Sequence, residues 1–146
     1  MAGIDGNNIS IGASVVITGQ GTADFRQPGA TFVSVAGVIV RASLSPANVA
    51  GSFCGVDVRN GRLLLGVMQG NYAPGRGRMT VLGEKNMAAH LDELYGVTAQ
   101  ARGTTITCSS GAVQITVTDT SLATGSVGLF TIGATARFTD ATYCMP

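Results

Sequence analysis

The feature that most constrains the fold is a succession of short runs rich in Val, Ile and Thr, each bounded by glycine or another turn-forming residue. In the first run, residues 9–18, apolar side chains such as Ile9, Ile11, Val15 and Ile17 alternate with polar or small ones. This is the period of a strand with one buried face. Later runs follow at a spacing of about ten residues, which is typical of an antiparallel sandwich or barrel. The pattern therefore predicts an all-β chain.

The predicted strands differ in burial. Residues 32–42 are almost continuously apolar, which favours a central strand covered on both faces. Residues 44–51 contain Pro46 and Asn48 and are interpreted as a connection. Residues 84–94 have apolar side chains at helical spacing, but the flanking pattern favours a strand or an extended crossing. Further strands are expected over residues 79–83, 95–102, 104–109, 112–119, 125–132 and 135–143.

The strongest local signal is the dipeptide Asn60-Gly61 between two β-rich runs, residues 53–59 and 62–69. Asn and Gly tolerate positive φ best, and a type I′ turn needs positive φ at both central residues. The sequence therefore predicts a hairpin with a two-residue loop. A glycine-rich, basic loop over residues 70–78 follows it.

Composition restricts the class of protein. Apolar residues make up 45% of the 146 residues and charged residues 12%, which is unlike a disordered chain. The net charge of +1 gives no field that would collect nucleic acid or an anionic membrane, and no apolar run is long enough to cross a bilayer. We expect one domain over residues 1–146, with residues 1–8 as a flexible or partner-binding arm that lacks the features of a secretory signal.

The three cysteines, Cys54, Cys108 and Cys144, are widely spaced and match no zinc-ligand pattern. Buried thiols in strands are the favoured interpretation. The alternative is one disulfide with a thiol left over, which would require an oxidising location.

From about Asp57 to Tyr143 the order of elements resembles the concanavalin A-like, or laminin G-like, jelly-roll domain. The resemblance rests on the hairpin at residues 56–65, the paired polar strands at 95–106, the Gly-Ser-Val-Gly-Leu strand within 117–129 and the closing strand at 136–141. It implies an antiparallel β-sandwich. Family members usually open with an aromatic-rich strand, and the chain has no Trp, so the sandwich is expected to be trimmed at its N-terminus or completed by a partner.

Catalytic chemistry has no support in the sequence. The eight acidic residues never fall in the alternating Glu-x-Asp-x-x-Glu arrangement of the family's hydrolases. His90 is the only histidine, so no His-centred triad is expected. We therefore predict that the protein is not an enzyme and that it has no catalytic residue, metal site or cofactor.

The candidate binding site is the loop containing Tyr72, Pro74, Arg76 and Arg78, because Tyr and Arg are enriched at protein interfaces. Few other aromatic side chains are available to stack on sugars.

These observations lead to the hypothesis of a structural or adhesion protein of a phage virion, decorating a tail or capsid. Its partners would be other virion proteins or copies of itself in a homo-oligomer, with a host-surface glycan as a further partner, and it would assemble in the host cytoplasm. The alternative is an extracellular carbohydrate-binding module of a secreted glycosidase.

Overall fold

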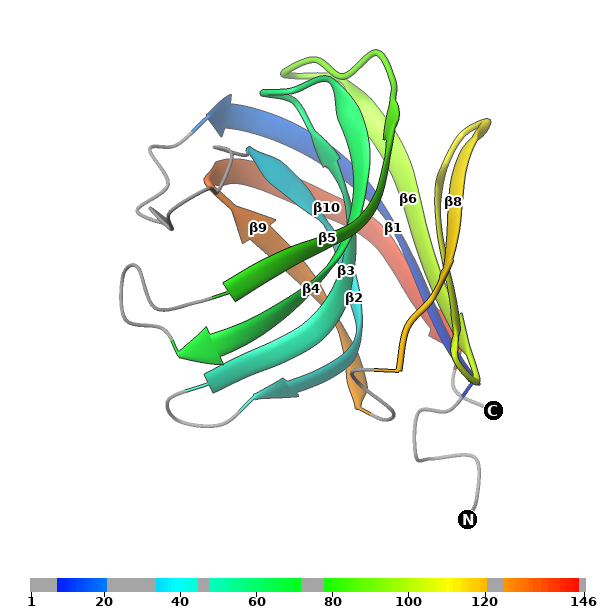
Figure 1. The fold of residues 1–146 in the computed structure, drawn as a ribbon. Helices are drawn as coiled ribbons and strands as arrows, with labels where there is room; N and C mark the ends of the chain where they lie inside the picture. The colour runs from blue at the N-terminus through cyan, green and yellow to red at the C-terminus, as the bar shows by residue number, and fades with distance from the viewer. Residues whose placement is uncertain (1–7, 21–33, 45–47, 72–77, 121–124, 145–146) are drawn as a thin grey trace.

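The computed structural model describes residues 8–20, 34–44, 48–71, 78–120 and 125–144, and these contain ten strands in two five-stranded antiparallel sheets (Figure 1). Sheet A has the order β10-β1-β6-β7-β8, and sheet B has the order β5-β4-β3-β2-β9. The two sheets face each other as the layers of a β-sandwich, as the sequence pattern predicts. Within the described residues no helix is present that has the length and apolar character to span a membrane.

Apart from β3, the strand bounds follow the predicted runs closely. Sheet A consists of β1 (Asn8–Gln20), β6 (Leu94–Arg102), β7 (Thr105–Ser110), β8 (Val113–Thr118) and β10 (Ala134–Cys144). Sheet B consists of β2 (Val35–Leu44), β3 (Asn48–Asp57), β4 (Arg62–Asn71), β5 (Arg78–Asn86) and β9 (Ser126–Ile132).

The main core lies between the sheets and is built by the alternation seen in the sequence. In β1, Ile9, Ile11, Val15 and Ile17 are all buried, while the residues between them are more exposed. The facing strands contribute aliphatic side chains such as Val38 of β2. The described part of the strand predicted over residues 32–42 is confirmed as central, because β2 lies between β3 and β9 and is buried on both faces.

A second apolar cluster lies on the outer face of sheet B, away from sheet A. It contains Val35, Ile39, Phe53, Leu64 and Ile132, all buried, and Phe53 contacts the ring of Phe130 with centroids 5.2 Å apart. Glycines on the same face leave room for these side chains. A Cβ at Gly66 would lie 2.6 Å from Cζ of Phe53 and 2.7 Å from the carbonyl oxygen of Thr80. Both faces of this sheet are therefore occupied by packed apolar side chains.

Two local predictions are wrong. The connection predicted over residues 44–51 is largely strand, because β3 begins at Asn48 and pairs with β4 from that residue onward. Pairing with Asn71 of β4 outweighs the turn preference of Asn48. The hairpin is present, but β3 ends at Asp57, which pairs directly with Arg62. The loop has four residues, and of them only Gly61 has a positive φ, of 63°, so the turn is not type I′.

Residues 84–94 form no helix. Strand β5 continues to Asn86, an irregular segment with a turn at Leu91 and Asp92 follows, and β6 begins at Leu94. This agrees with the predicted strand or extended crossing.

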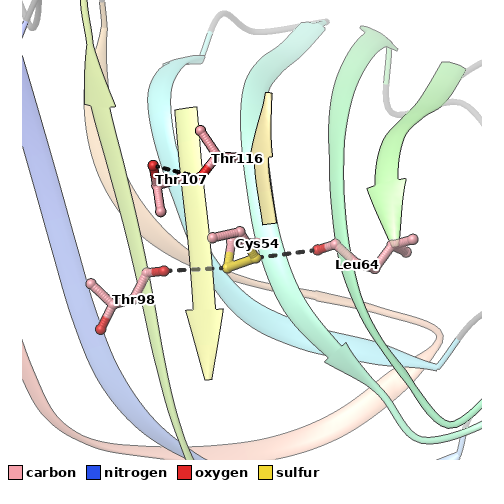
Figure 2. The surroundings of a disulfide bond; sticks show 6 residues. Cys54, Leu64, Thr98, Thr107 and Thr116 are labelled. Atoms are coloured by element: carbon pink, nitrogen blue, oxygen red, sulfur yellow. Dashed lines mark hydrogen bonds between the residues drawn. A yellow bond between two sulfur atoms is a disulfide. The ribbon is translucent and has the colours of Figure 1, made fainter. Parts of the chain in front are cut away.

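The favoured interpretation of the cysteines is also wrong. Cys54 of β3 and Cys108 of β7 form a disulfide that joins the two sheets through the core, and both residues are fully buried (Figure 2). The sulfur atom of Cys54 lies 3.4 Å from the carbonyl oxygen of Thr98, and that of Cys108 lies 3.8 Å from the carbonyl oxygen of Leu64. Alternation places both side chains inward on facing strands, which is why they meet. Cys144 is the thiol left over, and it is exposed.

Candidate functional site

The densest group of interacting charged side chains among the described residues lies at one end of the outer face of sheet B. It consists of Asp57, Arg62 and Glu84, which we call the Arg62 cluster. Nε of Arg62 donates to Oδ2 of Asp57 at 2.9 Å, and Nη1 of Arg62 donates to Oε2 of Glu84. Register positions the group, because Asp57 pairs with Arg62 across β3 and β4 and Arg62 pairs with Asn86 of β5.

Asp57 is the buried anchor of the Arg62 cluster, with a fully buried side chain. Its Oδ1 accepts from the backbone N–H groups of Ser34 and Arg59, each at 3.1 Å. Its Oδ2 accepts from Asn60 Nδ2 at 2.7 Å and from Arg62. Four donors compensate the desolvation of one carboxylate. The carboxylate therefore fixes both the hairpin loop and the orientation of the guanidinium.

The accessible part of the cluster is mainly Glu84. The side chain of Arg62 is 12% exposed and that of Glu84 is 55% exposed. A guanidinium offers a planar fork of N–H donors and a carboxylate offers several acceptor directions. The pair can therefore donate to and accept from neighbouring hydroxyl groups of one ligand.

The cluster is unsuited to glycoside hydrolysis. Such chemistry needs two carboxyl groups that both reach the sugar. Asp57 and Glu84 are joined through Arg62, but Asp57 is inaccessible and already accepts four hydrogen bonds. Sequence reasoning considered Asp57 and Glu84 only among the eight acids that form no catalytic arrangement, and it did not identify Arg62 as a site residue.

A second buried cation stabilises the far end of β2. Arg41 lies at an irregularity in the pairing of β2 with β3 and β9, with φ of 53°. Its Nη2 donates to the carbonyl oxygen of Gly103 in the turn between β6 and β7, which ties sheet B to sheet A. Burial lowers the pKa of Arg41, and the nearby charge of Asp119 opposes that shift. This arrangement holds the sheets together and leaves little of Arg41 for a ligand.

The loop predicted to bind a partner lies mostly outside the part of the chain that the structure describes. Tyr72, Pro74 and Arg76 lie outside the described residues. Arg78 is the first residue of β5, and its backbone pairs with Gln69. The predicted arm at residues 1–8 also lies outside the described residues, except Asn8, which begins β1.

No metal centre is formed by the described part of the chain, because no three His, Cys, Asp or Glu side chains gather there closely enough. His90 is exposed, and its backbone N–H donates to the hydroxyl of Tyr95 at 2.8 Å. That hydroxyl in turn donates to Glu93 at 2.8 Å. Burial is the largest of the causes that raise the pKa of Tyr95. The hydrogen bond to Glu93 and the charge of Glu93 also raise this pKa, whereas the hydrogen bond from His90 lowers it.

The two sheets and their strand order define a concanavalin A-like jelly-roll sandwich, as the sequence resemblance implies. The chain is similar in structure to the carbohydrate-binding module CBM66 from Bacillus subtilis, with a TM-score of 0.69 and 18% identity over 94% of this chain and 75% of the module.

Two further structures have the same sandwich. The GH43 protein BlXynB from Bacillus licheniformis matches 96% of this chain at 18% identity with a TM-score of 0.54, and this chain covers 28% of it. A functionally unknown protein from Saccharomyces cerevisiae matches 97% of this chain at 11% identity with a TM-score of 0.52, over 71% of that protein. No protein-family model and no curated protein matches the sequence. At these identities the similarity establishes the fold.

Proposed function

We propose that this protein binds carbohydrate without cleaving it. The observation that carries the proposal is the match of 94% of the chain to a solved carbohydrate-binding module. A fold alone does not determine function, so the proposal also needs a site with suitable chemistry. The Arg62 cluster provides one, because exposed Glu84 accepts hydrogen bonds and the small exposed edge of Arg62 donates them, and sugar hydroxyls do both.

The location we propose is extracellular. The buried disulfide between Cys54 and Cys108 supports it, because such bonds persist in oxidising compartments and are rare in the cytosol. The phage virion hypothesis gains nothing from the comparisons, since none of the three structures described above is presented as a virion protein. We therefore favour the carbohydrate-binding alternative.

A glycan array followed by titration calorimetry tests the proposal. We expect the oxidised protein to bind at least one defined oligosaccharide with millimolar or tighter affinity. Glu84→Ala should weaken that binding about tenfold to a hundredfold, since hydrogen bonds to charged groups contribute about 1.5–3 kcal/mol. Lys85→Ala is the matched control, because Lys85 is the next residue of β5, is also exposed and points to the opposite face.

Two results would contradict the proposal. One is an absence of glycan binding by correctly oxidised protein. The other is release of new reducing ends from the bound glycan, which would show cleavage.

A further inference from the structure

The outer face of sheet A carries a regular array of uncharged polar side chains. Two rows cross β1, β6, β7 and β8 in register, and we call their seven hydroxyl and amide side chains the hydroxyl face. One row runs Ser10, Gln100, Thr107, Thr116, and the other runs Gly12, Thr98, Ser109, Gln114. Their chain neighbours on these strands point into the core, so these residues point outward.

The spacing of the array follows from sheet geometry. Neighbouring strands lie about 4.8 Å apart, and side chains on one face of a strand lie about 6.7 Å apart. Four strands therefore present hydroxyls and amides over a width of about 14 Å. This is wide enough to contact several sugar units at once.

Three side chains of the hydroxyl face, Thr107, Thr116 and Gln100, are held in place before any ligand arrives. Threonine is stiff at χ1, and Oγ1 of Thr107 lies 3.4 Å from Oγ1 of Thr116 (Figure 2). A Cβ at Gly12 would lie 3.2 Å from Oγ1 of Thr98, so glycine there leaves space for that hydroxyl. With its amide oxygen toward Arg102, Gln100 accepts two hydrogen bonds, at 2.9 and 3.0 Å. Binding therefore requires little further ordering of side chains.

The composition of the face indicates the ligand class. Solvated sheet faces are usually a mixture of both charge signs. The two rows contain no acid, no base and no aromatic side chain. The cation of Arg102 borders the array, because Arg102 lies on the same face of β6 and its guanidinium reaches Gln100. The rows themselves offer no ring to stack on a sugar, but each of their seven hydroxyl and amide side chains donates and accepts hydrogen bonds. The complementary ligand is neutral and rich in hydroxyl groups.

We propose that the hydroxyl face is a second carbohydrate-binding surface and that it binds an extended, neutral polysaccharide. This rests on the proposed function and adds a site separate from the Arg62 cluster, which lies on the other sheet. A neutral hydrogen bond contributes only about 1 kcal/mol, so one sugar unit binds weakly and many units in register bind firmly. The face therefore selects long or insoluble chains over short oligosaccharides.

The test measures depletion of the full, oxidised protein from solution by insoluble cellulose, xylan, mannan and chitin. The double variant Thr107→Val, Thr116→Val keeps the β-branched shape and removes two hydroxyls. On the polymer that binds the unmodified protein, we expect the half-saturation concentration of the double variant to be about tenfold higher or more. Thr116→Glu should weaken retention as well, by placing a charge against a neutral surface.

Thr131→Val is the matched control, because Thr131 is an exposed threonine on β9 of sheet B. The polymer should retain this variant like the unmodified protein. The affinity of the double variant for the short oligosaccharide found on the array should stay unchanged.

The outcomes separate the two proposals. If the protein binds a short oligosaccharide but none of the four polymers, or if the double variant and Thr116→Glu are retained like the unmodified protein, the hydroxyl face is not a binding surface and the proposed function stands. If the unmodified protein binds neither short nor long glycans, both proposals are wrong. If light scattering shows that the variants change the oligomeric state, the face is an interface between copies of the chain, and the inference is wrong.

Discussion

At the scale of single residues, Asp57 has a clear structural role. Its carboxylate is fully buried, and it satisfies four donors, two from the backbone and two from side chains. It fixes Arg62, whose exposed edge forms part of the candidate site. One buried carboxylate therefore contributes both to stability and to the geometry of the candidate site.

We expect Asp57→Asn to lower the free energy of unfolding by about 3 kcal/mol, because it leaves Arg62 without a buried counter-charge and replaces acceptors with an amide. Urea denaturation measures the change. Asp140→Asn is the control, since Asp140 is exposed and its φ of 53° is tolerated by Asn, and it should change stability by less than about 0.5 kcal/mol. An effect of Asp57→Asn as small as that of the control would contradict the role assigned to Asp57.

Tyr95 makes stability sensitive to alkaline pH. The folded state raises the pKa of Tyr95 above its ordinary value of 10.0, so the protonated phenol is favoured by folding. The stabilisation is fully present below the unfolded pKa of about 10 and is lost as pH rises through the folded pKa.

Tyr95→Phe should therefore show a shallower loss of stability above about pH 10 than the unmodified protein. Tyr143→Phe, at an exposed tyrosine, is the control and should keep the original slope. Parallel pH profiles for Tyr95→Phe and the unmodified protein would refute this assignment.

At the scale of elements, the β3–β4 hairpin shows how much of the structure local sequence signals can predict. The Asn60-Gly61 pair correctly predicts that two strands turn back here, but a two-residue loop would place Arg59 directly opposite Arg62. Like charges in that position are unfavourable. The observed register instead pairs Asp57 with Arg62. Cross-strand charge was the signal in the sequence that could have identified both the register and the candidate site.

The disulfide between β3 and β7 could be deduced only partly from the sequence. Alternation places Cys54 and Cys108 inward, but which strands face each other across the core is a property of topology. Cys54 and Cys108 are 54 residues apart in the sequence, and this separation does not predict their Cα–Cα distance of 5.4 Å. The hydroxyl face was missed for the same reason, since its rows are assembled by the register of four strands.

Removing the disulfide should lower the free energy of unfolding by about 4 kcal/mol, from the entropy of the loop it closes in the unfolded chain. The double variant Cys54→Ala, Cys108→Ala, followed by urea denaturation, measures this. Cys144→Ser should leave stability unchanged, because Cys144 is exposed and outside the bond. Equal stability of the double variant and the unmodified protein would show that the bond is not a structural crosslink.

At the scale of the whole molecule, the fold class was predictable and the function was not. Alternation in β1, the apolar run of β2 and the regular turns determine a two-layer antiparallel sandwich. Function depends on which exposed side chains lie side by side, and neither Glu84 nor Thr116 belongs to a recognisable motif. The loop around Tyr72 remains a prediction.

Direct measurement of carbohydrate binding by the oxidised protein tests the central claim most directly. Titration calorimetry with the oligosaccharide selected on the array should give a saturable isotherm that Glu84→Ala weakens and Lys85→Ala does not. A flat isotherm with every glycan, from protein whose Cys54–Cys108 bond is verified, would contradict the account.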